Sequence, residues 1–185
     1  TGVDLPGESN SIFTKLEDVG EVELATAAFG QRTVNITPLQ MITAVCAIAN
    51  DGVLMKPRIV KQITNSDTGA VTNIEPVEVR QVLSAETANT MKSMMESVVV
   101  SGTGSRGAVA GYSVGGKTGT SEPIEANKTD GYVASYLAIS PVEDTQIVVL
   151  LALYDPTNKE RGHQGGTIAG PVVSQILTEI LPYLG

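Results

Sequence analysis

The sequence predicts an α+β fold in which helices pack on an antiparallel sheet. Two apolar segments, residues 131–140 and 146–154, have the composition of strands and are separated only by residues 141–145. So short a connection cannot hold a crossover helix, and the two strands are therefore predicted to be antiparallel neighbours. Three further segments have the apolar spacing of helices and are long enough to cover such a sheet.

The first predicted helix begins after Thr37. Thr37 is a favourable N-cap, Pro38 suits the first helical position, and Gln40 would complete a capping box. Gly52 is a suitable stop after the last turn. The inward face is predicted to hold Leu39, Ile42, Val45, Cys46 and Ala49. Cys46 is therefore expected to be a small buried apolar residue.

Two more helices are predicted further along the chain. One begins at Ser84, carries Glu86 in its first turn and ends near Gly102. Its inward residues are predicted to be Ala88, Met91, Met94, Met95 and Val98. The last helix is predicted to be capped by Thr167 or Gly170. Its apolar stripe comprises Val172, Val173, Ile176, Leu177, Ile180 and Leu181.

Between the helices the chain is predicted to form strands and turns. Residues 1–34 are expected to be irregular because glycines and a proline punctuate them. Residues 58–64 and 70–75 are predicted to form a surface hairpin around a polar turn. Residues 114–121 can be extended, and they are expected to lie antiparallel to the first of the two long strands. This order would place Lys117 on the outermost strand of the sheet.

The composition fits one packed domain. The chain has 185 residues, of which 42% are apolar and 17% charged, so disorder is not expected. A formal net charge of −8 argues against a nucleic-acid partner. One histidine and one cysteine argue against a zinc site, and no metal or cofactor is predicted. No apolar run approaches the ~20 residues of a membrane span. Because the chain begins with Thr1 rather than Met, we expect a fragment or a processed product.

The segment GYSVGGKTGT, residues 111–120, fits three short motifs that require different structures. The first is G-x-x-x-x-G-K-[ST], which cradles nucleotide phosphates on backbone N–H groups. It is met by Gly111, Gly116, Lys117 and Thr118. This motif needs a helix that begins at its lysine, and Gly119 and Pro123 are unfavourable in a helix interior. A nucleotide-binding site is therefore disfavoured.

The second motif is the nucleophile elbow G-x-S-x-G, which is met by Gly111, Ser113 and Gly115. The elbow needs a helix after its serine, and no helix signal follows Ser113. Asp155 and His163 do follow in the order of a Ser…Asp…His triad. In an extended strand Ser113 and Lys117 would have Cα atoms about 13 Å apart at ~3.3 Å per residue, too far for a direct hydrogen bond. A serine hydrolase is disfavoured as well.

The third motif is K-[ST]-G, which is met by Lys117, Thr118 and Gly119. In penicillin-binding proteins and β-lactamases this motif lies on a strand beside the active site. The extended character of residues 114–121 agrees with that position. Glycines at 115, 116 and 119 would leave the backbone open to a ligand.

Several segments, in family order, resemble the class B penicillin-binding proteins of high molecular mass. They are residues 1–8 (TGIDLPGE in the family), 28–31 with 36–40 (FGQG…VTPLQ), 47–57 (ANxG…P), 111–120 (GYxVxGKTGT) and 165–171 (GGxxAxP). Arg32 replaces the usual glycine of the second segment, which bears on the shape of that loop.

The resemblance implies a partial β-lactamase/transpeptidase-like fold, in which residues 1–185 form the C-terminal portion of a transpeptidase domain. The family's S-x-x-K and S-x-N motifs do not occur in the chain, and in the family both lie upstream of the segment that matches residues 1–8. We therefore expect the nucleophile on an N-terminal half of the same domain, which would be a partner of this chain. That half also supplies strands beside the one matching residues 146–154. We expect another copy, another chain or a rearranged local segment to cover this edge.

The resemblance also implies an activity, that of a serine D,D-transpeptidase. Such an enzyme cross-links peptidoglycan stem peptides ending in D-Ala-D-Ala and is acylated by β-lactams. It works at the extracytoplasmic face of the bacterial membrane, anchored by an N-terminal segment. The chain by itself is expected to be inactive. A non-catalytic β-lactam sensor or peptide-binding homologue is the alternative.

The implied site lies on the strand that carries the K-[ST]-G motif. Lys117 would supply positive charge, and the hydroxyls of Thr118 and Thr120 would bind the substrate's terminal carboxylate. The backbone N–H of Thr120 would donate to the oxyanion, so that Lys117 and Thr120 are the implied catalytic residues. Gly116 and Gly119 would keep the strand accessible to a peptide that pairs with its edge.

Overall fold

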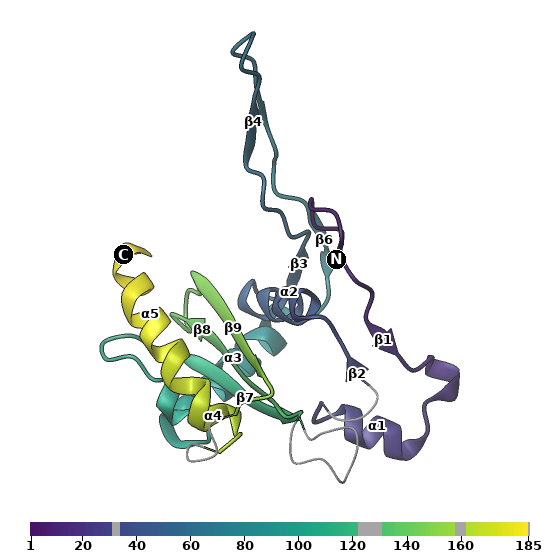
Figure 1. Ribbon diagram of the computed structural model, residues 1–185, viewed down its shortest axis with the longest axis vertical. Coiled ribbons are helices and arrows are strands. Elements are labelled where there is room, and N and C mark those ends of the chain that lie inside the picture. Colours follow the sequence, from purple (N-terminus) through teal and green to yellow (C-terminus); the bar gives the residue numbers. More distant parts are fainter. Residues whose placement is uncertain (31–33, 122–130, 158–161, 185) are drawn as a thin grey trace.

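The computed structural model describes residues 1–30, 34–121, 131–157 and 162–184. Its centre is a three-stranded antiparallel sheet with strands in the order β7-β8-β9 (Figure 1). The strands are β7 (Gly115–Ser121), β8 (Val133–Ser140) and β9 (Ile147–Tyr154). This arrangement confirms the predicted strand order and the position of Lys117 on an outer strand.

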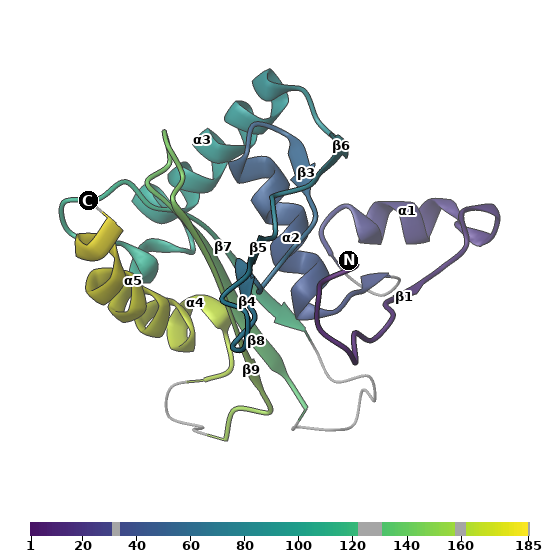
Figure 2. The same cartoon turned by 90° about the horizontal axis from the view of Figure 1, so that it is seen from above.

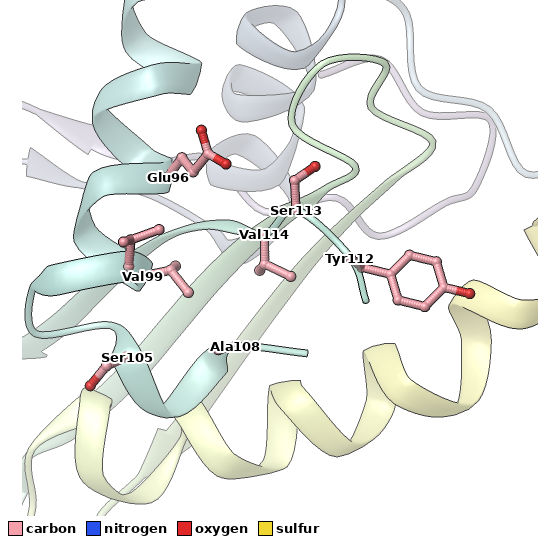
Figure 3. Close-up of a pocket in the computed structure, with 8 residues that line it drawn as sticks. Glu96, Val99, Ser105, Ala108, Tyr112, Ser113 and Val114 are labelled. Atoms are coloured by element: carbon pink, nitrogen blue, oxygen red, sulfur yellow. The ribbon is translucent and has the colours of Figure 1, made fainter. Parts of the chain in front are cut away.

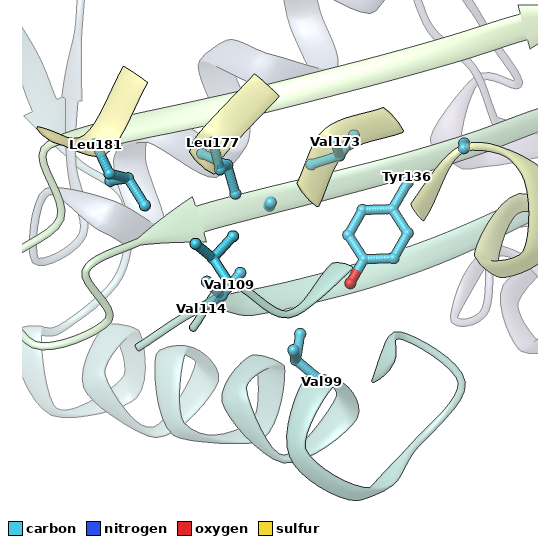
Figure 4. Close-up of a cluster of buried hydrophobic side chains, with 9 residues drawn as sticks. Val99, Val109, Val114, Tyr136, Val173, Leu177 and Leu181 are labelled. Atoms are coloured by element: carbon cyan, nitrogen blue, oxygen red, sulfur yellow. The ribbon is translucent and has the colours of Figure 1, made fainter. Parts of the chain in front are cut away.

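Helices cover both faces of the sheet, which confirms the α+β prediction (Figure 2). The helices α4 (Gly165–Ile168) and α5 (Gly170–Leu184) lie on one face, and α2 (Pro38–Ala49) and α3 (Ala85–Ser101) lie on the other. The core on the α5 side surrounds the fully buried ring of Tyr136 (Figure 4). Its other members are Val99, Val109, Val114, Ala138, Ala169, Val173, Leu177 and Leu181. The core between the sheet and α2 and α3 is smaller and comprises Val45, Met95, Leu137 and Ile139.

The remaining elements are short. They are β1 (Ile12–Phe13), η1 (Leu16–Asp18), α1 (Glu21–Ala27), β2 (Val34–Asn35), β3 (Val53–Met55), β4 (Gln62–Thr64), β5 (Val71–Asn73), β6 (Glu78–Gln81) and η2 (Ser105–Gly107). Residues 1–34 were predicted to be irregular, and this was wrong for α1. This helix is short, and none of its residues is buried. The predicted hairpin is confirmed as β4 and β5, which pair antiparallel and project away from the body of the protein (Figure 1).

The helices α2 and α3 begin at the N-caps that the sequence predicts. The Oγ1 atom of Thr37 accepts a hydrogen bond from Gln40 N at 3.2 Å, and Ser84 caps α3 in the same way through Thr87 N at 3.1 Å. The capping box at Thr37 is not closed directly. Ser11 is inserted, because its hydroxyl accepts from Thr37 N at 3.0 Å and donates to the Gln40 side chain. At the C-terminal end, Thr167 lies inside α4 and Gly170 is the first residue of α5, so the predicted caps there were wrong.

Some predicted core positions are exposed. On α3 the buried stripe is Ala88, Lys92, Met95 and Val99, whereas Met91 and Met94 are exposed. The stripe is rotated because Lys92 occupies a buried position, where its Nζ atom lies 3.2 Å from the Asp51 carboxylate. Cys46 was also predicted wrongly: α2 buries Val45 and Ala47, and the cysteine between them is exposed. On α5, Val172 is exposed while the next residue, Val173, is fully buried.

The second edge of β9 has no strand partner among the described residues. A local strand therefore does not pair with this edge within the described part of the chain. Cover by another copy or another chain stays a prediction. In the described ranges we find no helix of the length and apolarity that crossing a membrane would require.

Candidate active site

The structure shows which of the three motif interpretations of residues 111–120 agrees with the local backbone. Lys117 lies within β7 and begins no helix, which confirms the rejection of a nucleotide-binding loop. Ser113 is followed by this strand and not by a helix, which confirms the rejection of a nucleophile elbow. Pro123, which entered the argument against a helix, lies outside the described residues.

The side chains of the rejected triad are engaged elsewhere. The Ser113 hydroxyl donates to the Glu143 carboxylate at 2.6 Å and accepts from Val142 N at 3.0 Å. The hydrogen bond from Ser113 holds the pKa of Glu143 below its usual value. His163 stacks on the ring of Tyr132 with centroids 3.8 Å apart. No hydrogen bond joins Ser113 to His163 among those of the described residues, which agrees with the rejection of a hydrolase triad.

The third motif occupies the outer strand, as predicted. Among the described residues no strand pairs with the outer edge of β7, which is the kind of edge that an extended peptide can join as an added strand. Lys117 is exposed, and its Nζ atom donates to the carbonyl oxygen of Thr118 at 2.6 Å. Thr118, Gly119 and Thr120 are half-buried. The outer strand therefore carries a cation and two hydroxyls, on residues that are exposed or half-buried.

Each threonine hydroxyl on β7 has a partner from another part of the chain. The Thr120 Oγ1 atom accepts a hydrogen bond from Gly165 N, at the start of α4, at 3.1 Å. Thr118 Oγ1 lies 3.2 Å from the Oγ1 atom of Thr103, in the turn after α3. Because the oxygen of Thr120 already accepts an N–H, its own hydrogen is available for donation. Such a hydroxyl is suited to a carboxylate, which only accepts hydrogen bonds.

Glycines bring α4 and the turn after α3 close to the strand. A β-carbon at Gly165 would lie 2.2 Å from Ser135 O and 2.3 Å from Gly119 O. Both atoms belong to the backbone of the sheet, so only glycine allows this approach. In the sequence, Gly165 is marked only by the family resemblance, and no motif marks Thr103. The local signal for Thr103 was its place in a glycine-rich stretch.

Gly116 has a packing role that the sequence analysis did not foresee. It is buried, and a β-carbon there would lie 2.7 Å from the Tyr136 hydroxyl oxygen. Tyr136 donates to Gly104 O at 2.6 Å, and burial raises the pKa of Tyr136 to about 12. The phenol is therefore a neutral donor at any physiological pH. The expected role of Gly116 and Gly119 in keeping the strand open to a ligand stays a prediction.

A shallow hollow of about 290 Å³ lies between α3 and the segment that precedes β7 (Figure 3). It is lined by Glu96, Val99, Val100, Ser105, Ala108, Tyr112, Ser113 and Val114. None of these residues belongs to the motif from Lys117 to Thr120, so the hollow is not the candidate site.

An antiparallel sheet between two helical layers, with an open K-T-G edge strand, defines a class of acyl-transferring enzymes. Residues 1–178 match the penicillin binding protein transpeptidase domain family. The chain belongs to this family, among the transpeptidase domains of class B penicillin-binding proteins.

Named relatives match most or all of the chain. Stage V sporulation protein D from Bacillus subtilis (strain 168) is 41% identical over 188 residues, which are 100% of this chain and 29% of that protein. The peptidoglycan D,D-transpeptidase PbpA from Mycolicibacterium smegmatis is 30% identical over 83% of this chain and 31% of its own length. The chain thus spans less than a third of the length of these two relatives.

Solved structures share the fold. The transpeptidase domain of penicillin-binding protein 3 from Burkholderia pseudomallei has a TM-score of 0.82 and is 34% identical, over 99% of this chain and 53% of its own. Penicillin-binding protein 3 from Mycobacterium tuberculosis, complexed with aztreonam, has a TM-score of 0.85 and is 31% identical, over 99% of this chain and 43% of its own. The partial α+β architecture predicted from the sequence is therefore that of this family.

Proposed function

We propose that this chain is the substrate-binding portion of a serine D,D-transpeptidase that cross-links peptidoglycan stem peptides and is acylated by β-lactams. The observation that carries the proposal is the open edge of β7, where Lys117, Thr118 and Thr120 lie together on a family-matched strand. Residues 1–185 would be the C-terminal portion of the domain, and the nucleophile would lie on an upstream half.

The proposed reaction has two steps. The serine oxygen of the upstream half attacks the carbonyl carbon of the penultimate D-Ala, the peptide C–N bond breaks, and the terminal D-Ala leaves with a proton on its nitrogen. The amine of a second stem peptide then attacks the ester, and the serine oxygen leaves. A β-lactam enters the first step only, because its ring opens without releasing a leaving group.

The residues of β7 would act on the substrate's charge. Lys117 would hold a positive charge beside the substrate carboxylate and the proton path of the serine. The hydroxyls of Thr118 and Thr120 would donate to the carboxylate, and the N–H of Thr120 would donate to the oxyanion. Gly116 and Gly119 would allow the ligand backbone to approach. The stem peptide would lie along the open edge as an added strand.

The proposed setting follows from the family. Relatives are named as peptidoglycan D,D-transpeptidases, and a solved relative holds aztreonam. We infer that the whole protein acts on peptidoglycan outside the cytoplasm, anchored to the membrane by an upstream segment. Its partners would be the stem peptide, β-lactams and the upstream half of the same domain.

The test uses the complete domain, in which Thr120→Val is compared with Thr120→Ser. Both variants keep the size of the residue close to that of threonine, but only valine removes the hydroxyl. A hydrogen bond to a charged group contributes about 1.5–3 kcal/mol, so valine should slow acylation by a fluorescent penicillin about ten- to a hundred-fold. Serine should retain most of the rate.

Two results would contradict the proposal. The first is a Thr120→Val variant that is acylated as fast as the parent. The second concerns the alternative of a non-catalytic sensor. A domain that is acylated by penicillin but never releases D-Ala from a stem peptide in the presence of an acceptor amine would be such a sensor.

A further inference from the structure

The hydroxyl of Tyr136 is a buried donor on the strand next to β7, and among the described residues its hydrogen-bond partner is Gly104 O. Tyr136 is opposite Thr118 in the β7–β8 register, its side chain is fully buried, and its hydroxyl donates to Gly104 O at 2.6 Å. Figure 4 shows the phenol directed from β8 toward the segment that follows α3. A simple core position would be filled as well by phenylalanine, so the hydroxyl calls for a separate explanation.

The hydroxyl lies in a cage of glycines. A β-carbon would lie 2.1 Å from the Tyr136 oxygen at Gly107, 2.7 Å at Gly116 and 2.9 Å at Gly104. The turn after α3 therefore sits directly on the phenol. The hydrogen bond from Tyr136 to Gly104 O holds this turn at a fixed distance from the sheet. The turn can approach the phenol this closely because glycines have no side chains.

The same turn carries Thr103. Its hydroxyl lies 3.2 Å from that of Thr118, and either oxygen can be the donor. If Thr118 donates to a carboxylate, its oxygen must accept from Thr103, because a hydroxyl has one hydrogen. The orientation of the Thr118 hydroxyl then depends on where Thr103 is held. Thr103 is held by the turn that Tyr136 anchors.

We propose that Tyr136 is a positioning residue for the carboxylate-binding end of β7, and that it acts through the Gly104 carbonyl and the Thr103 hydroxyl on Thr118. The inference rests on the proposed function, since it assigns Tyr136 a part in recognising the substrate carboxylate. Tyr136 itself touches no substrate. It is a buried support for a surface hydroxyl.

The experiment measures acylation of the complete domain by benzylpenicillin and by its methyl ester, which lacks the carboxylate charge. Tyr136→Phe removes only the hydroxyl, and Thr103→Val removes the next hydroxyl in the path. Each variant should slow acylation by benzylpenicillin about five-fold, the equivalent of about 1 kcal/mol for one hydrogen bond. Acylation by the methyl ester should be unchanged.

Two further variants make the result specific. The double variant should be no slower than Thr103→Val, because both changes interrupt one path. Val173→Ala is the control for a loss of stability alone. Val173 is fully buried in the same core as Tyr136, but it is not part of the path. This control should lower the melting temperature without changing the ratio of the two acylation rates.

The outcomes are distinguishable. If Tyr136→Phe slows both probes equally, or slows neither, the positioning role is refuted. If the losses of the two single variants add in the double variant, the path through Thr103 is refuted. If the unmodified domain forms no adduct with benzylpenicillin, the proposed function fails first and the inference fails with it.

Discussion

Gly165→Ala tests whether α4 is docked on the sheet as closely as the structure indicates. The added β-carbon would meet Ser135 O at 2.2 Å and Gly119 O at 2.3 Å. Both distances are more than 1 Å below an ordinary van der Waals contact of about 3.5 Å. The two oxygens belong to adjacent strands of the central sheet, so neither can move aside by a side-chain rotation. The start of α4 must therefore shift away from β7 and β8.

The cost has two parts. Inserting a carbon into a packed site typically costs about 1–3 kcal/mol, and the rigid backbone here favours the upper end. The shift would also break the hydrogen bond from Gly165 N to Thr120 Oγ1, which adds about 1 kcal/mol. We expect a loss of roughly 3–4 kcal/mol. For a domain of 150–250 residues this lowers the melting temperature by about 6–16 °C.

The matched control is Gly20→Ala, which adds the same carbon at the N-cap of α1. A β-carbon there would meet only the end of the flexible Glu23 side chain, at 2.7 Å from Oε2, and the φ of −84° suits alanine. Thermal unfolding of both variants, followed by circular dichroism, compares the two changes. If Gly165→Ala is as stable as Gly20→Ala, the close docking of α4 is wrong, and the orientation inferred for the Thr120 hydroxyl falls with it.

Three further predictions concern the site and the base of the hairpin. Lys117→Gln in the complete domain should reduce acylation by benzylpenicillin at least a hundred-fold. The melting temperature should stay within ~2 °C of the parent, because the Lys117 side chain is exposed. A large loss of stability would contradict a role limited to the site. The chain by itself should form no covalent adduct with a fluorescent penicillin, and a stoichiometric adduct found by intact mass would refute the assignment of the nucleophile to another segment. Hydrogen bonds from Ile59 N at 2.8 Å and Val60 N at 2.9 Å lower the pKa of the Asp4 carboxyl below its usual 3.8. The stabilisation by Asp4 is therefore complete above that usual value and is lost as the pH falls through the lowered pKa. The amides of Ile59 and Val60 should lose hydrogen-exchange protection in acid, after correction for intrinsic rates, and Asp4→Asn should remove this pH dependence.

The sequence predicted those parts of the fold that depend on local or nearly local rules. The N-caps at Thr37 and Ser84 are encoded within four residues, and the structure has both. The antiparallel pairing of β8 and β9 follows from the short connection between them, which leaves no other topology. The position of Lys117 on an outer strand followed from the extended character of residues 114–121 and from the lack of helix signals after Lys117.

The buried face of α3 and the hydrogen-bond partners in the candidate site were not predicted, because contacts between residues far apart in the sequence determine both. Periodicity placed Met91 and Met94 inward, but the ion pair between Lys92 and Asp51 makes a lysine the buried residue of that turn. The partner of the Thr118 hydroxyl is 15 residues away and that of the Thr120 hydroxyl is 45 residues away. No local pattern indicates such contacts. The sequence therefore placed the candidate residues on the outer strand, but not the contacts that hold them there.

The hydrogen-bond partners also explain how an acidic chain can offer a site for an anion. The formal net charge of −8 disfavours a carboxylate at long range, but salt at physiological ionic strength screens exposed charges beyond about 8 Å. At shorter range the proposed carboxylate ligand would meet the ammonium of Lys117 and two hydroxyls. The oxygen of Thr120 accepts a hydrogen bond from Gly165 N, and its own hydrogen is available for donation. Thr118 can offer its hydrogen in the same way when Thr103 donates to it. In the proposed site, the backbone N–H of Gly165 and the hydroxyl of Thr103 would therefore orient the two threonine hydroxyls toward an anion, and Lys117 would supply the positive charge.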